Sequence, residues 1–142
     1  MKAPSRIIRP DLSCWLYTSQ CALPRSWAPG AVEHIVATSL ARNADMTITG
    51  ALLFTGTHFA QFLEGPAQGL ATIRHSITAD TRHHTIRTML DSRCSRRRFA
   101  DWSLAYAGPS LFVADQVQAL PGGRKSDVAA ILRLLREFTR IR

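Results

Sequence analysis

A glutamine in an otherwise apolar segment is the feature of this sequence that most requires a chemical explanation. Residues 47–54 and 58–64 predict two β-strands joined by a tight turn. Because side chains alternate along a strand, Gln61 shares one face of the second strand with Phe59 and Leu63. A buried primary amide is costly unless its oxygen and both N–H donors find partners. We therefore expect polar groups to lie against this face of the hairpin.

Other polar and aromatic side chains fall where the predicted fold would bring them to this glutamine. The set is Tyr17, Asn43, Gln61 and Trp102. Taken singly, the two aromatic residues are typical of a core and the asparagine is typical of a helix C-cap. Taken together, they can line a slot between two helices, with Ile35 and Ile77 as its apolar walls. A flat heterocycle with hydrogen-bonding groups on its edge would fit such a slot.

Signatures of catalysis are few. The sequence contains no glycine-rich nucleotide-binding loop, zinc-hydrolase motif or serine-hydrolase motif. The rings of the adjacent His83 and His84 point apart on any regular element, which favours surface or helix-end histidines over a metal site. The arginines beside Cys94 could lower its pKa, but no base accompanies the thiol. We therefore expect neither an enzyme nor a metal site.

The order of the predicted elements favours an α+β, ferredoxin-like fold. Apolar spacing predicts helices around residues 32–40 and 70–77. Besides the hairpin, β-forming residues predict strands at 12–19, 86–92 and 101–107. The resulting βαββαββ order gives a mixed five-stranded sheet, and the short connections place both helices on one face.

Residues 109–142 are predicted to form a C-terminal helical extension to a domain at 12–108, and residues 1–11 form a leader. The extension comprises a short helix at 111–120 and a last helix whose apolar residues within 128–138 form a stripe. That stripe must be buried on the free face of the sheet, on another copy of the chain, or on a partner.

Composition is typical of one globular domain. The chain has 142 residues, of which 46% are hydrophobic and 20% charged, enough for a core without disulfides. Three cysteines without C-x-x-C spacing and the lack of an export signal favour a cytoplasmic protein, and we expect no membrane contact. The net charge of +8 is concentrated at residues 93–98 and 124–142. A solvated basic surface is its ordinary explanation, and nucleic acid, an acidic partner or a phosphate-bearing ligand are the alternatives.

Six short segments of the sequence form a pattern: LYTSQ at 16–20, RN at 42–43, ITG at 48–50, FAQFLEG at 59–65, DTRH at 80–83 and RRFADWS at 97–103. Together they resemble the corresponding segments of the BLUF domain, the blue-light sensor that uses FAD. The resemblance extends from about Leu12 to Ala107 and agrees with the predicted α+β order. It implies that the chain is a blue-light photoreceptor that binds FAD.

The resemblance also implies roles for individual residues. Tyr17 matches the tyrosine that donates an electron to the photoexcited flavin, and Gln61 matches the glutamine between that tyrosine and the flavin. The matches to flavin-binding positions are Asn43 at the ring edge, Ile35 and Ile77 on its two sides, and Arg82 and His83 near the ribose and phosphates. Trp102 matches the strand-five tryptophan whose placement is linked to the signalling state.

Gln61 can act as a two-state element because an amide has an acceptor end and a donor end of nearly equal shape. The resemblance implies that light-driven transfer from Tyr17 exchanges these ends or shifts the amide to its imidic tautomer. A stronger hydrogen bond to the flavin would then shift its absorption to the red. Two residues depart from the family pattern: Leu104 stands where methionine is frequent, and Arg42 where some relatives have histidine or asparagine. We therefore expect the signal relay at Leu104 and the contacts of Arg42 at the flavin edge to differ from those of other family members.

No output domain follows in the chain, so the resemblance implies a downstream effector in trans, such as a cyclic-dinucleotide phosphodiesterase or a transcription regulator. It also implies a homo-oligomer. One alternative is a light-independent basic module that binds nucleic acid or an acidic partner, with nucleic acid the less favoured of the two. A flavin-dependent redox enzyme is a further alternative, but no acid/base group in the sequence supports it.

Overall fold

The structure is a computed structural model that describes residues 11–100, 105–107 and 125–139. In chain order, its elements are β1 (Leu12–Cys21), α1 (Ala28–Asp45), β2 (Thr49–Phe54), β3 (His58–Pro66), α2 (Ala67–Ala79), β4 (His83–Arg93), β5 (Ala105–Ala107) and α4 (Lys125–Thr139). The predicted βαββαββ order is confirmed. The predicted helix at 111–120 and the first residues of the predicted fifth strand, 101–104, lie outside the described residues.

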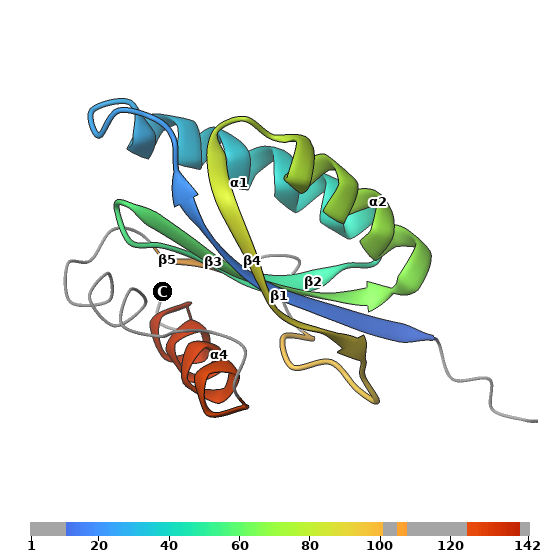
Figure 1. Cartoon of the computed structure of the whole chain (residues 1–142). Coiled ribbons are helices and arrows are strands. Elements are labelled where there is room, and N and C mark those ends of the chain that lie inside the picture. The colour runs from blue at the N-terminus through green and yellow to red at the C-terminus, as the bar shows by residue number, and fades with distance from the viewer. Residues whose placement is uncertain (1–10, 101–104, 108–124, 140–142) are drawn as a thin grey trace, which may run out of the picture.

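The five strands form one mixed sheet in the order β4-β1-β3-β2-β5. Neighbouring strands are antiparallel except β2 and β5, which are parallel. Figure 1 shows α1 and α2 on one face of the sheet and α4 on the other. The predicted α+β, ferredoxin-like layout, with its first two helices on one face, is therefore confirmed.

Alternation along β3 divides the core between the two faces of the sheet. Leu63 packs beneath α2 with Leu70 and Ile73. On the opposite face, Phe62 belongs to the apolar cluster that includes residues of α4. Gln61 therefore faces the two helices, as the alternation predicts, in a strand buried on both sides.

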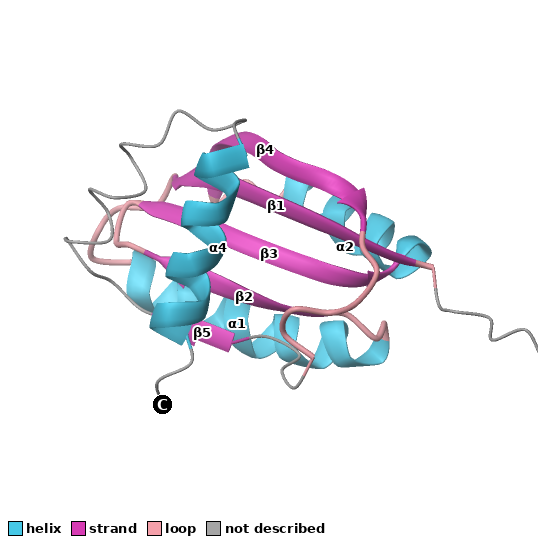
Figure 2. Cartoon of the chain, turned by 90° about the horizontal axis from the view of Figure 1, so that it is seen from below, coloured by secondary structure: helices cyan, strands magenta, loops and turns pink. Residues whose placement is uncertain are grey.

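The last helix, α4, packs on the free face of the chain's own sheet. Its residues Ile131 and Leu135 are fully buried and lie in one cluster with Leu16 and Phe62. Figure 2 shows α4 crossing the strands on the face opposite α1 and α2. Of the three predicted ways to bury the apolar stripe, the structure shows the first.

Two local predictions differ from the structure. The first predicted helix does not end at Asn43, because the N–H of Met46 bonds to the carbonyls of Arg42 and Asn43 and continues the helix to Asp45. Asn43 is therefore a buried residue of the last turn and not a C-cap. β4 begins at His83, earlier than predicted, because this edge strand extends its pairing with β1 as far as Cys21.

Candidate functional site

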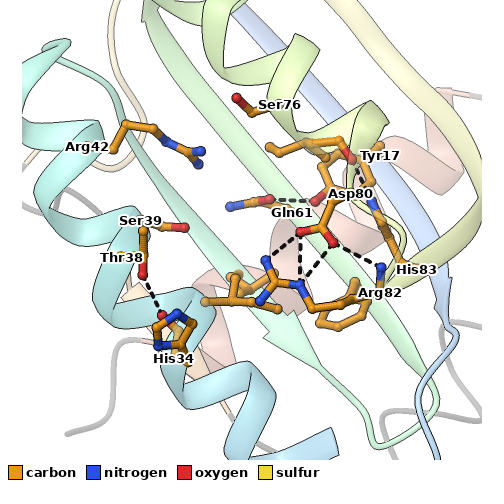
Figure 3. A pocket seen from close by; sticks show the side chains of 14 residues that line it. Tyr17, His34, Thr38, Ser39, Arg42, Gln61, Ser76, Asp80, Arg82 and His83 are labelled. Atoms are coloured by element: carbon orange, nitrogen blue, oxygen red, sulfur yellow. Dashed lines mark hydrogen bonds and ion pairs between the residues drawn. The ribbon is translucent and has the colours of Figure 1, made fainter.

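A pocket opens between α1 and α2 on the helix-covered face of the sheet (Figure 3). It holds about 710 Å³ of empty space, which includes open solvent at its mouth. Three groups of residues line it: His34, Ile35, Thr38, Ser39 and Arg42 from α1; Tyr17, Leu52, Phe59 and Gln61 from the strands; Ser76, Ile77, Asp80, Arg82 and His83 from α2 and the segment after it.

A buried hydrogen bond between Tyr17 and Gln61 forms the floor of the pocket. The two residues are direct partners in the β1–β3 ladder. The Tyr17 hydroxyl donates to Gln61 Oε1 at 2.6 Å, and the side chains are only 3% and 6% exposed. The amide nitrogen of Gln61 points away from Tyr17 into the pocket (Figure 3). Within the described part of the chain, the Gln61 side chain thus has one hydrogen-bond partner, and its donor end faces the pocket.

Burial raises the pKa of Tyr17 above its ordinary value, the Asp80 carboxylate raises it further, and Arg42 opposes them. The ordinary tyrosine pKa is about 10. Since the folded state holds the proton more tightly than the unfolded chain, this contribution to stability is complete below about pH 10 and is lost as the pH rises above it. The Tyr17 hydroxyl therefore remains the hydrogen-bond donor to Gln61 throughout the physiological range.

We expect the free energy of unfolding, measured with urea between about pH 8 and pH 11, to decline above pH 10. In Tyr17→Phe that decline should be smaller, because the phenol that titrates only on unfolding is gone. The second tyrosine of the chain, Tyr106, provides the control variant Tyr106→Phe. A decline that is equally steep in wild type and in Tyr17→Phe would contradict the burial argument.

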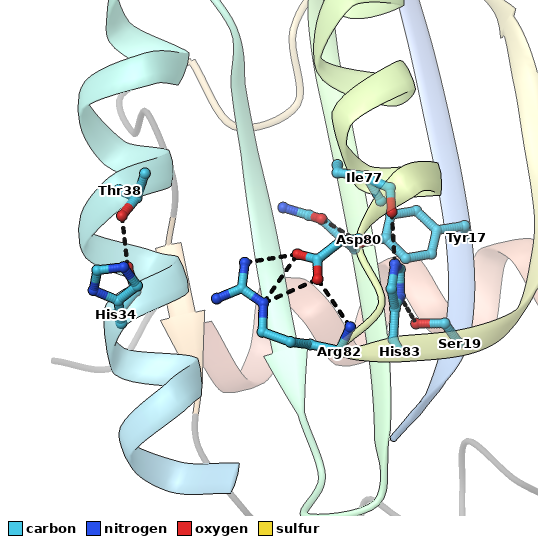
Figure 4. Close-up of polar contacts among 9 residues, drawn as sticks. Tyr17, Ser19, His34, Thr38, Ile77, Asp80, Arg82 and His83 are labelled. Atoms are coloured by element: carbon cyan, nitrogen blue, oxygen red, sulfur yellow. Dashed lines mark hydrogen bonds and ion pairs between the residues drawn. The ribbon is translucent and has the colours of Figure 1, made fainter. Parts of the chain in front are cut away.

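An ion pair lies at one side of the pocket. Arg82 Nη2 lies 2.7 Å from Asp80 Oδ2, and Arg82 Nε also donates to the carboxylate. Hydrogen bonding from Arg82 holds the pKa of Asp80 below its usual value. The carboxylate therefore stays charged and keeps the guanidinium beside the pocket (Figure 4).

His83 links β1 to the end of α2 (Figure 4). Its Nε2 lies 2.7 Å from the carbonyl oxygen of Ile77, and its Nδ1 lies 2.7 Å from Ser19 Oγ. Because a carbonyl can only accept, Nε2 carries the proton, and in the neutral ring Nδ1 accepts from the serine hydroxyl. These bonds hold the α2 end against β1 and so fix the wall that carries Ile77.

The groups that face the pocket fit a flat ligand with acceptors on its edge. Among the described residues, no atom pairs with the buried Nε of Arg42. This donor, the Gln61 amide nitrogen and the Ser39 hydroxyl lie on the same side of the pocket in Figure 3. Ile35 and Ile77 supply apolar surface from the two helices. An isoalloxazine ring, which is planar and carries carbonyl and ring-nitrogen acceptors along one edge, has the shape and chemistry that these residues suit.

Most of the predicted site residues come together here. Tyr17, Ile35, Gln61, Ile77, Arg82 and His83 all line the pocket. Asn43 does not line it, but it is fully buried directly after Arg42, and its carbonyl accepts from the N–H of Ile48. Trp102 and Leu104 lie outside the described residues.

Five lining residues were not anticipated from the sequence: His34, Thr38, Ser39, Leu52 and Ser76. Helical spacing contains the signal for two of them, because Thr38 and Ser39 follow Ile35 by three and four positions and share its face. Their small size and polarity gave no reason to single them out.

The thiol and histidine alternatives find no support in the structure. Burial raises the pKa of Cys94, so the structure does not support the lowered pKa that the neighbouring arginines could have given: desolvation outweighs the nearby Arg97. His84 is exposed, and its Nδ1 lies 2.8 Å from the Thr85 hydroxyl. Within the described part of the chain, no three histidine, cysteine or carboxylate side chains gather where a metal ion could bind.

The fold and this pocket define the class of protein, an α+β domain with a pocket between two helices. The sequence model of the BLUF family, described as "Sensors of blue-light using FAD", matches residues 12–105. The chain therefore belongs to the BLUF family, and it is a blue-light sensor that uses FAD. The sequence-based predictions of the family, the photoreceptor function and the cofactor are confirmed.

Individual relatives agree with this assignment. The Escherichia coli (strain K12) blue light- and temperature-regulated antirepressor BluF is 38% identical over 81 residues, which are 57% of this chain and 19% of BluF. The dark-state structure of the BLUF protein BlrB is 31% identical, with a TM-score of 0.74 over 89% of this chain and 96% of BlrB. A complex of Klebsiella pneumoniae BlrP1 with manganese and cyclic diGMP is 25% identical, with a TM-score of 0.62 over 86% of this chain and 28% of BlrP1. The chain thus spans less than a third of BluF and BlrP1 but nearly all of BlrB.

None of the described helices combines the length and the apolar character that a membrane-spanning segment requires.

Proposed function

We propose that FAD binds in the pocket between α1 and α2 and that the Tyr17–Gln61 pair is the light switch of this photoreceptor. The observation that carries the proposal is the buried 2.6 Å hydrogen bond at the pocket floor. It holds the amide of Gln61 with its acceptor toward the tyrosine and its donor toward the ligand. A side chain in that position has two orientations that a ligand can distinguish.

Several residues would hold the cofactor. Ile35 and Ile77 would pack on the two sides of the isoalloxazine ring, with Arg42, Gln61 and Asn43 near its edge. The placement of Asn43 directly after Arg42 in the last turn of α1 supports its inclusion. Arg82 and His83 would lie near the ribose and phosphates, where a guanidinium favours negative charge.

The chain's own part in switching is an exchange of hydrogen bonds. Bound FAD supplies the absorption of blue light and the electron-accepting chemistry. Tyr17 holds the proton that it donates to Gln61 Oε1, and its raised pKa keeps that proton in place in the dark. Reversing the amide would turn its nitrogen toward Tyr17 and its oxygen into the pocket, so the group presented to the ligand would change from donor to acceptor. Trp102 and Leu104 are proposed to relay this change.

We further propose that the domain occupies residues 12–108, between a leader at 1–11 and an extension at 109–142, and that it signals in trans as a homo-oligomer. A transcription regulator or a cyclic-dinucleotide phosphodiesterase would be its effector. The name of BluF, an antirepressor, and the cyclic diGMP bound in the BlrP1 complex support these two classes. Free cysteines at 14, 21 and 94 support a reducing, cytoplasmic location.

A pair of substitutions on one helix tests where FAD binds. Ile35 lines the pocket, whereas Leu40 is 41% exposed and does not. We expect Ile35→Trp to weaken FAD binding at least tenfold, about 1.4 kcal/mol, by filling the slot. Leu40→Trp should change the Kd less than twofold, because tryptophan there enters solvent. Wild-type affinity in a folded Ile35→Trp protein would contradict the proposed site, and protein that stays colourless with FAD would contradict the function.

A further inference from the structure

A second groove lies on the opposite face of the sheet, along α4. It holds about 1080 Å³ of empty space including its mouth. Met89 and Leu90 of β4 line one part of it, Arg98 and Phe99 of the following loop line another, and one face of α4 completes it. Figure 2 shows that loop to one side of α4, on the face away from α1 and α2. This groove has no part in the flavin pocket.

The α4 residues in the groove form a regular stripe. They are Lys125, Val128, Ala129, Leu132, Arg133 and Arg136. Successive steps of three, one, three, one and three residues keep them on one helical face over three turns. At about 1.5 Å per residue, the stripe is roughly 17 Å long, enough for three turns of another helix to lie beside it. Val128 and Leu132 are only half-buried, so the apolar floor of the groove is incompletely covered.

The charge around the groove has one sign. Among the described residues, four cationic side chains and no carboxylate line it. Within the described part of the chain, no acidic side chain forms an ion pair with Arg98, Lys125 or Arg133, whereas Arg74, Arg82 and Arg93 each have one. Arg136 lies over the Phe99 ring, with its guanidinium carbon 5.4 Å from the centroid, and Arg136 Nη2 donates to the Arg98 carbonyl at 3.0 Å. That contact joins α4 to the loop and closes one side of the groove.

We propose that this groove binds an acidic amphipathic helix of a partner protein. The cations at the rim would pair with carboxylates, and the half-covered floor between them would take the apolar face of the helix. The apolar floor favours a helix over nucleic acid, because a phosphate backbone makes no use of exposed valine and leucine side chains. The inference rests on the proposed function for the partner itself, since a photoreceptor that signals in trans needs a docking surface.

The probe is a synthetic, fluorescein-labelled 15-residue helix with leucines along one face and glutamates elsewhere, and binding is followed by fluorescence anisotropy with full-length protein in the dark. Two control peptides carry lysine in place of glutamate or serine in place of leucine. We expect the acidic amphipathic peptide to bind at least about tenfold more tightly than either control, a difference of about 1.4 kcal/mol. Its affinity should fall as salt is raised.

Two protein variants locate the binding. Arg133→Glu reverses one exposed charge at the rim and should weaken binding about tenfold, a free-energy loss within the range known for interfacial charge pairs. Ala129→Trp, at an exposed position, should weaken it by filling the groove. Arg25→Glu is the matched control, because Arg25 is exposed and outside the groove, and its affinity should stay within about twofold of wild type.

Several outcomes would overturn the inference. These are equal binding of the acidic and lysine peptides, displacement of the peptide by a short DNA duplex, and dissociation of a homo-oligomer by Arg133→Glu. Tighter peptide binding after truncation of the side chains of residues 111–120 would also overturn it, because the chain's own segment would then occupy the groove. The light-induced flavin shift is recorded on the same samples. Wild-type protein that shows the light-induced shift but does not bind the acidic peptide refutes only the groove, and absence of the shift in wild type refutes the proposed switch.

Discussion

Gln61→Leu is expected to keep FAD bound and to lose the light-induced red shift of the flavin absorption completely. Leucine has nearly the volume of glutamine but neither an acceptor for the Tyr17 hydroxyl nor a donor for the pocket. The variant should also lose stability by about 1–3 kcal/mol, because a buried hydroxyl is left without its partner. The measurement is a light-minus-dark absorption spectrum of purified protein, followed through recovery in darkness.

Gln68→Leu is the control for this substitution. Gln68 is an exposed glutamine near the start of α2, so the same chemical change there should leave both the shift and the stability unaffected. Tyr17→Phe should also abolish the shift, because the proton donor to the amide is removed. A Gln61→Leu protein that still shifts its absorption on illumination would show that another group is the switch.

Glu64→Ala is expected to lower the free energy of unfolding by roughly 3–5 kcal/mol, because each buried backbone donor left without an acceptor costs about 1–3 kcal/mol. Glu64 is fully buried on β3. Its two oxygens accept from the backbone N–H groups of Arg98 at 2.7 Å and Phe99 at 2.6 Å, and Oε2 also accepts from the Thr49 hydroxyl at 3.0 Å. Alanine would leave two backbone donors without an acceptor and create a cavity.

Urea unfolding of wild type, Glu64→Gln and Glu64→Ala measures this effect. Glutamine keeps one acceptor but opposes a donor to the second backbone N–H, so its loss should lie between those of the other two proteins. Glu33→Ala is the control, because Glu33 is exposed on α1 and should change stability by less than about 0.5 kcal/mol. An equally small change in Glu64→Ala would contradict the view that this carboxylate holds the loop after β4.

The Glu64 contact joins the two faces of the molecule. Gln61 and Glu64 lie three residues apart on one strand and point to opposite faces of the sheet. Glu64 holds the loop at Arg98 and Phe99, and that loop is tied to α4 by Arg136. The strand that carries the pocket amide is therefore in continuous contact with the groove along α4. Movement of β3 on illumination would reach the proposed docking surface by this route as well as through the predicted relay in strand five.

The spacing of residues along the chain was sufficient to predict much of the pocket between α1 and α2. Alternation in residues 58–64 predicted that Gln61 shares a face with Phe59 and Leu63, and the structure shows that this face lies toward the helices. The pairing of Gln61 with Tyr17 is seen in the β1–β3 ladder of the structure. Helical spacing predicted that Ile35 and Ile77 lie on inward faces. Residue spacing did not predict the end of the first helix, because hydrogen bonds beyond Asn43 continue it. It also did not indicate the direction of the Cys94 pKa shift, because burial affects that pKa more than the neighbouring charge does.

By itself, the sequence determined the order of the elements, the face on which Gln61 lies and the family to which the chain belongs, because each depends on periodicity or on short segments read in order. Tertiary structure alone decided where α4 packs, which backbone groups Glu64 accepts from, and that four separated cations share one groove with an apolar floor. Those features join residues distant in the chain, and their energies depend on burial and direction, which residue spacing does not encode. The sequence alone showed that Gln61 is a polar residue in an apolar strand. Its buried hydrogen bond to Tyr17 and the pocket on its other side could be seen only in the tertiary structure.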